Sequence, residues 1–194
     1  MIASFIMVSL DGFFEGDKPW EIDWHQTDGE FNEFAVEQLG KFDTLVFGRA
    51  TYEGMAQYWS SEEAIRTDPE VASRMNDADK IVVSRSLEKP EPAWHNARLV
   101  KDPRQLRGIG KDLLVLGSAV LTTSLMEEGL LDELRIIVNP VLIGSGRSFA
   151  GSAKRRIRLK LRNRREFRNG NVLLIYEPEA AEGGTTAVRG PAGA

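Results

Sequence analysis

The junction Gly48-Arg49-Ala50-Thr51 combines residue types that bind anions, and it directly follows an apolar run. Gly48 lets the backbone turn sharply and come close to a ligand, and Arg49 offers a planar, permanently charged fork. Thr51 is expected to cap the helix that follows, whose free N–H groups favour negative charge. A phosphorylated cofactor is the anion that this combination suggests.

Two further apolar runs end in residues of the same kind, Ser84-Arg85 in one case and Gly117-Ser118 in the other. In an open parallel sheet, ligands bind beyond the carboxyl ends of the strands, because loops and helix N-termini converge there. Arginines at successive strand ends suit a phosphate on a ribose, whereas Gly117 and the amides after it suit a pyrophosphate. Any one of these ends, taken alone, is more readily explained as an ordinary turn. Together they predict a dinucleotide with an extra phosphate, NADP rather than NAD.

A nicotinamide cofactor delivers a hydride, so such a protein must hold the acceptor carbon and supply or relay a proton. Asp11 is one candidate for this chemistry, because it ends the first apolar run, where its side chain would face the crevice. The dipeptide Asp11-Gly12 is equally well explained as a turn, so both interpretations stay open.

A long loop from Phe13 to Thr27 is rich in aromatic residues, and loops of this length are often lids or binding loops. Trp24 could stack on a flat heterocycle, and the imidazole of His25 could relay a proton. We therefore expect both residues in the substrate site. The alternative is that these aromatic residues only anchor their own loop.

Apolar periodicity predicts the elements that must position these residues. The expected strands are 2–8, 43–47, 79–83, 97–100, 112–116 and 132–138, and the expected helices are 28–41, 51–58, 69–76 and 119–128. A hairpin over 157–176 turns at Asn169-Gly170. This order predicts an α/β fold: a three-layer helix–sheet–helix sandwich around a mostly parallel mixed sheet that ends in an antiparallel hairpin. Residues 1–178 are expected to form one domain and 179–194 a flexible tail.

The bulk composition argues against several classes of partner. A net charge of -4 and a pI near 5.4 give no overall attraction to nucleic acid or anionic membranes. The absence of cysteine excludes disulfides and thiolate metal sites, and no metal site is expected. The N-terminus has no basic leader, and no apolar run approaches the roughly 20 residues of a membrane span. A cytoplasmic protein is expected.

One segment is strongly basic, although the chain as a whole is acidic. Residues 154–168 hold nine lysines and arginines and a single acidic residue, Glu166. The basic side chains alternate with Ile157, Leu159 and Leu161, which is typical of the solvent face of a half-buried strand. We therefore expect a solvated strand face and no nucleic-acid partner.

The ordered series of motifs resembles the dihydrofolate reductase superfamily, and more narrowly the reductase domain of bacterial bifunctional riboflavin-biosynthesis enzymes. The resemblance spans about residues 2–177. It rests on Ser9-Leu10-Asp11-Gly12, Phe47-Gly48-Arg49-Ala50-Thr51-Tyr52-Glu53, Val83-Ser84-Arg85, Leu116-Gly117-Ser118, Gly129-Leu130-Leu131-Asp132-Glu133-Leu134 and Pro140-Val141-Leu142-Ile143-Gly144-Ser145-Gly146. The resemblance implies an NADPH-dependent reductase.

The resemblance also assigns roles to residues. Those implied for the adenosine ribose phosphate are Arg49, Ser84 and Arg85; those for the pyrophosphate region are Thr51 and Gly117; Gly144 belongs to a neighbouring loop. The family commonly has a second glycine where this chain has Ser118, so we expect weaker or altered binding there. In dihydrofolate reductases a carboxylate on the first helix lies four residues before an aromatic residue, and Glu30 with Phe34 reproduces this spacing. Glu30 is more readily explained as a charge in the first helical turn that favours the helix dipole.

The resemblance leaves the substrate open. A riboflavin-pathway reductase acts on 5-amino-6-(5-phosphoribosylamino)uracil and opens its sugar to a ribityl chain, whereas a pterin or dihydrofolate reductase reduces a ring C=N bond. A non-catalytic module that senses NADP or a flavin is the alternative to an enzyme. The family often forms homodimers, and strand edges such as 132–138 could serve as the interface.

Overall fold

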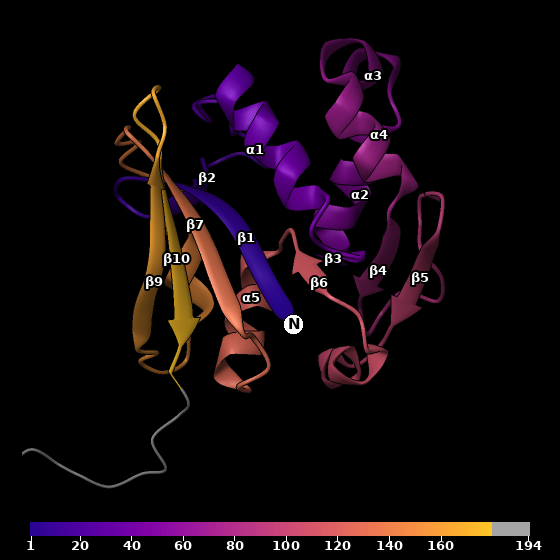
Figure 1. The fold of residues 1–194 in the computed structure, drawn as a ribbon. Helices are drawn as coiled ribbons and strands as arrows, with labels where there is room; N and C mark the ends of the chain where they lie inside the picture. The colour runs from indigo at the N-terminus through magenta and orange to yellow at the C-terminus, as the bar shows by residue number, and fades with distance from the viewer. Residues whose placement is uncertain (180–194) are drawn as a thin grey trace, which may run out of the picture.

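The computed structural model describes residues 1–179. An eight-stranded sheet forms the central layer, in the order β5-β4-β3-β6-β1-β7-β10-β9 (Figure 1). Its strands are β1 (Ile2–Ser9), β3 (Thr44–Gly48), β4 (Asp79–Val83), β5 (Ala97–Val100), β6 (Leu113–Val115), β7 (Glu133–Asn139), β9 (Leu159–Glu166) and β10 (Val172–Pro178). The strands from β5 to β7 run parallel, whereas β10 and β9 pair antiparallel. The predicted fold class is therefore confirmed.

Helices cover both faces of this sheet. One face carries α1 (Gly29–Leu39), α2 (Arg49–Trp59), α3 (Glu62–Thr67) and α4 (Pro69–Asp77); the other carries α5 (Ala119–Glu127) and the short 3-10 helices η1 (Pro103–Ile109) and η2 (Phe149–Ser152). A separate two-stranded sheet pairs β2 (Phe13–Glu15) with β8 (Arg147–Ser148). Among residues 1–179, no helix is long and apolar enough to cross a membrane. The predicted tail lies outside the described residues from position 180 onward.

Strand residues alternate between the two layers, as a sheet that is buried on both faces requires. In β3, Leu45 and Phe47 pack among residues of α2 and α4, whereas Val46 packs among residues of α5. All three side chains are at most 1% exposed. The alternation fixes which face of the sheet each following helix must cover.

The structure differs from the expected helices in two places. Thr51 does not cap the helix, because α2 already begins at Arg49 with Gly48 as its N-cap. Gly48 is also the last residue of β3, so the strand passes into the helix without an intervening loop. Helix α3 is additional to the predicted helices: the Ser61 side chain caps it, and only Ala64 of its six residues is buried. Such a short helix has too little apolar periodicity to be recognised.

The hairpin differs from the expected half-buried strand. Leu159 and Leu161 are 38% and 48% exposed, because β9 is the edge strand of the sheet and, within residues 1–179, pairs only with β10. The expectation that 132–138 offers a free edge is also wrong, since β7 lies between β1 and β10.

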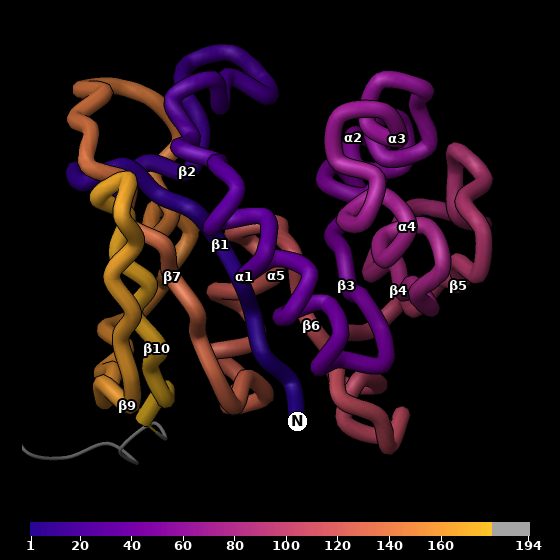
Figure 2. Tube along the Cα trace, turned by 45° about the horizontal axis from the view of Figure 1, so that its top comes forward, coloured from indigo at the N-terminus to yellow at the C-terminus, as the bar shows by residue number. Residues whose placement is uncertain are grey.

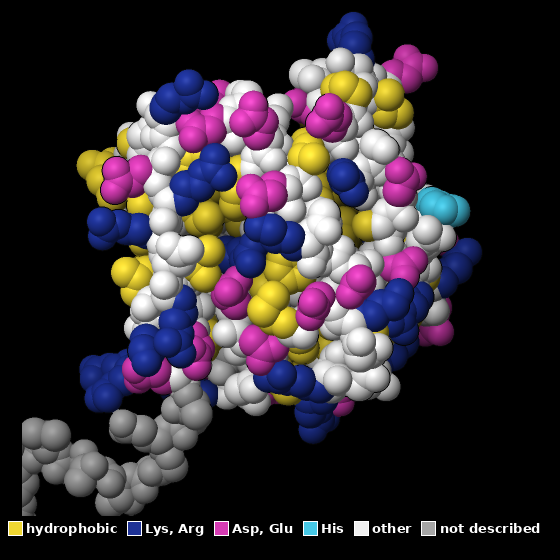
Figure 3. Space-filling model, viewed as in Figure 1, with side chains coloured by type: hydrophobic (Ala, Val, Ile, Leu, Met, Phe, Trp, Pro, Cys, Tyr) yellow, Lys and Arg dark blue, Asp and Glu magenta, His cyan; other side chains and the backbone are white. Residues whose placement is uncertain are grey.

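The basic residues of the hairpin lie beside carboxylates. Arg165 contacts Glu30 at 3.4 Å, and Arg162 pairs with Glu177 on the adjacent strand. Figure 3 shows this mixture of basic and acidic side chains over the viewed face. The pairing agrees with a solvated strand face, and the expectation of no nucleic-acid partner stays a prediction.

Candidate functional site

The topology creates a crevice at the carboxyl ends of β3 and β6. These strands are hydrogen-bonded neighbours, but α2 follows β3 on one face of the sheet and α5 follows β6 on the other. In open α/β sheets, ligands bind where successive connections diverge in this way. The loops after β1 and β7 stand at this same end of the molecule, as do α2 and α3 (Figure 2). The predicted cofactor residues of β3 and β6 are thus brought to one place.

Gly48 and the Gly117-Ser118 peptide are in direct contact. The Gly48 N–H donates to the Gly117 carbonyl oxygen at 2.9 Å. A Cβ at Gly48 would lie 2.8 Å from the Ser118 hydroxyl, and a Cβ at Gly117 would lie 3.1 Å from the Thr51 hydroxyl. Gly117 has φ of +115°, a conformation that side-chain-bearing residues rarely adopt. Close contact with the Ser118 side chain therefore favours glycine at position 48, and the positive φ favours glycine at position 117. Thr51 is part of the same cluster although it is not the cap.

Ser118 has a clear structural role. It is the N-cap of α5, and its hydroxyl accepts a hydrogen bond from the Leu121 N–H at 3.3 Å. The peptide bond between Gly117 and Ser118 is cis. The N-terminus of α5 opens at this peptide, where free N–H groups and the helix dipole favour an anion.

The predicted arginines lie along the same row of strand ends. Arg49 is half exposed, and its Nε donates to Glu53 at 2.7 Å, one helical turn away. Ser84 is buried, and its hydroxyl accepts from the Leu87 N–H at 3.3 Å, whereas Arg85 is exposed. Because β4 pairs with β3 in register, Ser84 lies one residue beyond the partner of Gly48.

Lys101 is a further cation at this edge that the sequence analysis did not single out. It follows β5, the next strand in the sheet, and its ammonium group donates to the backbone carbonyls of Arg85 and Leu87. The position of Lys101 just after the predicted strand 97–100 is the sequence signal that could have identified it. Cationic side chains therefore follow three adjacent strands: β3, β4 and β5.

Asp11 connects the end of β1 to the predicted Gly144 loop. Its carboxylate accepts from the Ser9 hydroxyl at 2.6 Å, the Gly144 N–H at 2.8 Å and the Ile143 N–H at 3.3 Å. These hydrogen bonds, the Ser9 hydroxyl foremost, lower the pKa of the Asp11 carboxyl. Asp11 is exposed at the carboxyl end of β1, so it lies at the crevice as expected, and it also holds the Gly144 loop. Its catalytic role stays a prediction.

Glu30 lies in the first turn of α1 and faces the hairpin. Its side chain is 16% exposed and accepts from the Arg168 N–H at 2.9 Å, with Arg165 at 3.4 Å. The Arg168 N–H foremost, and then both guanidinium groups, lower the pKa of Glu30. Phe34, four residues on, is 6% exposed in the core beside Phe167, at 5.5 Å between ring centroids. The catalytic role of Glu30 and the substrate role of Phe34 stay predictions.

Trp24 and His25 pack edge to face, with ring centroids 4.4 Å apart. Burial lowers the pKa of His25 from 6.5 to about 4, so its imidazole is neutral near pH 7. Its buried Nε2 has no hydrogen-bond partner among the described residues. The next residue, Gln26, is held by two fully buried amides: its N–H donates to Asn139 at 2.9 Å, and its carbonyl accepts from Asn171 at 2.8 Å. The loop is thus tied to β7 and the hairpin turn, and the substrate roles stay predictions.

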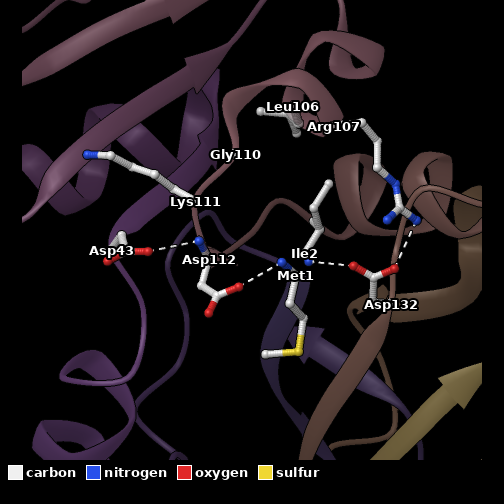
Figure 4. Close-up of a pocket in the computed structure, with 9 residues that line it drawn as sticks. All are labelled: Met1, Ile2, Asp43, Leu106, Arg107, Gly110, Lys111, Asp112 and Asp132. Carbon is white, nitrogen blue, oxygen red and sulfur yellow. Dashed lines mark hydrogen bonds and ion pairs between the residues drawn. The ribbon is translucent and has the colours of Figure 1, made fainter.

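A second pocket, of about 360 Å³, lies at the opposite, amino-terminal end of the strands (Figure 4). Its polar groups satisfy one another. Asp132 accepts from the Ile2 N–H at 2.7 Å and pairs with Arg107 at 2.9 Å, and Asp112 pairs with the amino group of Met1 at 2.7 Å. These contacts clamp strand ends together, which explains the pocket without a ligand.

The fold and the crevice define a dihydrofolate reductase-like α/β protein. Residues 1–173 match the family described as the RibD C-terminal domain, and the chain belongs to this family. The family is of the riboflavin-pathway reductase type, and RibD reductase domains in general use a pyridine nucleotide.

One relative is an uncharacterized protein, YyaP, from Bacillus subtilis, which is 32% identical over 88% of this chain and 91% of its own length. A putative riboflavin biosynthesis protein from Shewanella has a TM-score of 0.70 at 21% identity over 92% of this chain and 99% of that one. A pyrimidine reductase-like protein from Corynebacterium diphtheriae has a TM-score of 0.58 at 11% identity over 92% of both chains. RibD from Acinetobacter baumannii gives 0.63 at 13% identity, over 92% of this chain and 58% of that longer chain.

Proposed function

We propose that this protein is an NADPH-dependent reductase of a small heterocyclic substrate. The substrate would be of the 5-amino-6-(5-phosphoribosylamino)uracil type or a pterin of the dihydrofolate type. The observation that carries the proposal is the contact of Gly48, Thr51, Gly117 and Ser118 at the point where α2 and α5 diverge, flanked by a row of cations. Family membership supports the reductase class.

The residues present fit a phosphorylated dinucleotide. A Cβ at Gly48 or Gly117 would meet the side chain of Ser118 or Thr51, so the close packing of these strand ends around the start of α5 needs glycine at both positions. The free N–H groups at the start of α5 would hold the pyrophosphate. Arg49 and Arg85 would hold the extra ribose phosphate. Arg49 must share or leave Glu53 to do so, and such an exposed ion pair contributes at most about 1 kcal/mol.

When bound, the nicotinamide supplies a hydride. The protein's own groups must then orient the acceptor and manage the proton. Asp11 and Glu30 both have lowered pKa values, so each is ionised at neutral pH and would act by accepting a hydrogen bond from the substrate. Neutral His25, whose Nε2 has no hydrogen-bond partner within residues 1–179, would accept a proton at that nitrogen.

Cofactor binding is tested by titrating the protein with NADPH and with NADH while its thermal unfolding is followed. We expect a larger thermal shift with NADPH, and we expect Arg49→Ala to weaken NADPH binding about tenfold or more while it changes NADH binding little, because a charge-assisted hydrogen bond to the extra phosphate is lost. Arg66→Ala, at an exposed arginine of α3, is the matched control. The absence of any shift with NADPH would reject the proposal.

A sensor that binds the cofactor without turnover is the second candidate. The observation that favours it is the engagement of both candidate carboxylates by protein donors: Asp11 by three and Glu30 by two arginines. Loss of NADPH absorbance with dihydrofolate or with 5-amino-6-(5-phosphoribosylamino)uracil would identify the enzyme and its substrate. Binding of NADPH with no turnover of either compound supports the sensor.

A further inference from the structure

A groove of about 650 Å³ runs along the outer face of α2, and the proposed cofactor contacts do not use it. One wall is the side chain of Trp20 from the loop after β2, and the other is Pro92 with the residue that follows it. The floor is α2 itself, including Gly54 and the polar side chains of Glu53 and Gln57. The volume is within the range of small-molecule sites.

Trp20 is seated directly on Gly54. A Cβ at position 54 would overlap the indole ring, so only glycine lets the ring rest against the helix. Trp20 has φ of +63°, which is unusual for so large a residue. Its backbone N–H donates to the buried carboxylate of Glu15. Glu15 is fixed in turn by Arg147 of β8 at 2.7 Å. The ring is therefore held in place by its own loop and remains 44% exposed.

The opposite wall is equally well fixed. The Tyr52 hydroxyl donates to the Pro92 carbonyl oxygen at 2.8 Å, which ties this loop to α2. Trp94, two residues on, is 6% exposed in the core, and its indole N–H donates to Asn76 at 2.7 Å. The groove thus lies between two anchored walls, one aromatic and one formed by proline.

The polar groups of the floor define the chemistry of the occupant. The Oε1 atom of Glu53 accepts a hydrogen bond from Arg49, whereas its Oε2 atom accepts none within residues 1–179. The Gln57 amide is exposed and makes no hydrogen bond in the same part of the chain, so it can both donate and accept. A carboxylate oxygen beside an amide is complementary to a flat ring that carries an amino group and a ring nitrogen or carbonyl. Trp20 supplies a face for such a ring to stack on.

We propose that the groove between Trp20 and Pro92 binds a planar, amino-substituted nitrogen heterocycle, with Trp20 as its stacking wall. This inference extends the proposed function, on which its biological meaning rests. The same ring chemistry occurs in an aminopyrimidine or pterin substrate and in the adenine of the cofactor. The experiment must therefore distinguish these two sources.

Nuclear magnetic resonance of the tryptophan indole N–H groups tests the site directly. The chain has four tryptophans, so the Trp20 signal is identified by its loss in Trp20→Phe. The full-length protein is titrated separately with 5,6-diaminouracil and with adenosine 2′,5′-bisphosphate. We expect the Trp20 signal to shift in a saturable way with one of them, which names the source of the ring. No saturable shift with either compound overturns the inference.

Gly54→Ala is the decisive variant. Its new methyl group must displace Trp20, and the higher helix propensity of alanine offsets part of the cost of that displacement, which thermal unfolding of the variant measures. We expect a moved Trp20 signal before any ligand is added and about a tenfold weaker affinity for the ring, the size of a lost stacking contact. Gly29→Ala, in the first turn of α1 with open space around it, is the matched control and should change neither.

An unchanged ring affinity in Gly54→Ala, with the Trp20 signal displaced, overturns the inference even if NADPH binds. Failure of the wild-type protein to bind NADPH, with ring binding that still depends on Gly54, rejects the proposed function and leaves the groove as a binding site. The two proposals therefore fail on different measurements.

Discussion

At the scale of single residues, the site depends on groups whose neighbours fix their charge. Asp11 and Glu30 accept hydrogen bonds from protein donors and stay ionised, whereas buried His25 stays neutral. Asp11 holds the Gly144 loop, and Glu30 holds the hairpin turn through Arg168. In the proposed site these charges would be set before a ligand arrives, which would reduce the reorganisation that binding requires.

The buried His25 should make the free energy of unfolding depend on pH in the acid range. Its pKa is about 4 in the folded protein and 6.5 when unfolded, so below pH 6.5 the unfolded chain takes up a proton that the folded protein does not. Stability should fall as the pH drops from 6.5 to 4, by up to about 3 kcal/mol. In His25→Phe this part of the loss should vanish.

Urea unfolding of both proteins at pH 7 and pH 4.5 measures the effect. From pH 7 to pH 4.5, the wild-type protein should lose about 2 kcal/mol more unfolding free energy than His25→Phe does. His95→Gln, at the exposed second histidine, is the control. A difference that is equal at both pH values contradicts the assignment.

At the scale of elements, a buried lysine joins α4, β4 and the loop before β5. Lys80 is fully buried, and its ammonium donates to the carbonyls of Asn76 at 2.7 Å, Ala78 at 2.8 Å and His95 at 3.0 Å. It also lies 4.6 Å from the centre of the Trp94 ring. Burial lowers the pKa of Lys80 to about 8, which leaves it mostly charged at pH 7. This clamp supports the wall of the proposed groove that contains Pro92.

Lys80→Met should destabilise the protein by about 3 kcal/mol, because three carbonyl oxygens lose the ammonium donor that binds them together. Urea unfolding at pH 7 provides the measurement. Lys111→Met is the matched control: Lys111 pairs with Asp79 at 2.8 Å, but both side chains are about half exposed, so the expected cost is at most about 1 kcal/mol. Equal losses in the two variants would show that the three carbonyl contacts of Lys80 contribute nothing.

At the scale of the whole molecule, the sheet ends in an edge strand with unusual side chains. Leu159 and Leu161 are exposed on β9, an eight-residue strand whose outer edge pairs with no other strand of the described residues 1–179. Natural proteins usually cover or protect such an edge. We propose that two copies meet through β9, which moves the expected homodimer interface from β7 to the edge of the sheet.

Size-exclusion chromatography with light scattering tests this proposal. The wild-type protein should have twice the 21.6 kDa mass of the chain, and Leu161→Asp should shift it toward the mass of one chain. Ile65→Asp, which changes an exposed apolar residue of α3 instead, should leave the mass unchanged. A wild-type protein that elutes at the mass of a single chain across the accessible concentrations would contradict the dimer.

The sequence by itself determined the elements and the strand ends, because apolar periodicity and glycine chemistry act over a few residues. It predicted β3, β4 and β6 and the Gly48, Ser84 and Gly117 ends that the fold places side by side. Ends of neighbouring parallel strands must meet, so this part of the site followed from local patterns.

Only the tertiary structure decided the contacts between distant segments. It placed β7 inside the sheet and left β9 at its edge. It also brought Asp11 to the Gly144 loop, 133 residues away, and Trp20 onto Gly54. The alternation of β9 is the same whether or not a layer covers it, and a glycine in a helix does not reveal which ring will rest on it. Strand pairing and burial are set by the whole chain at once, so local patterns cannot specify them.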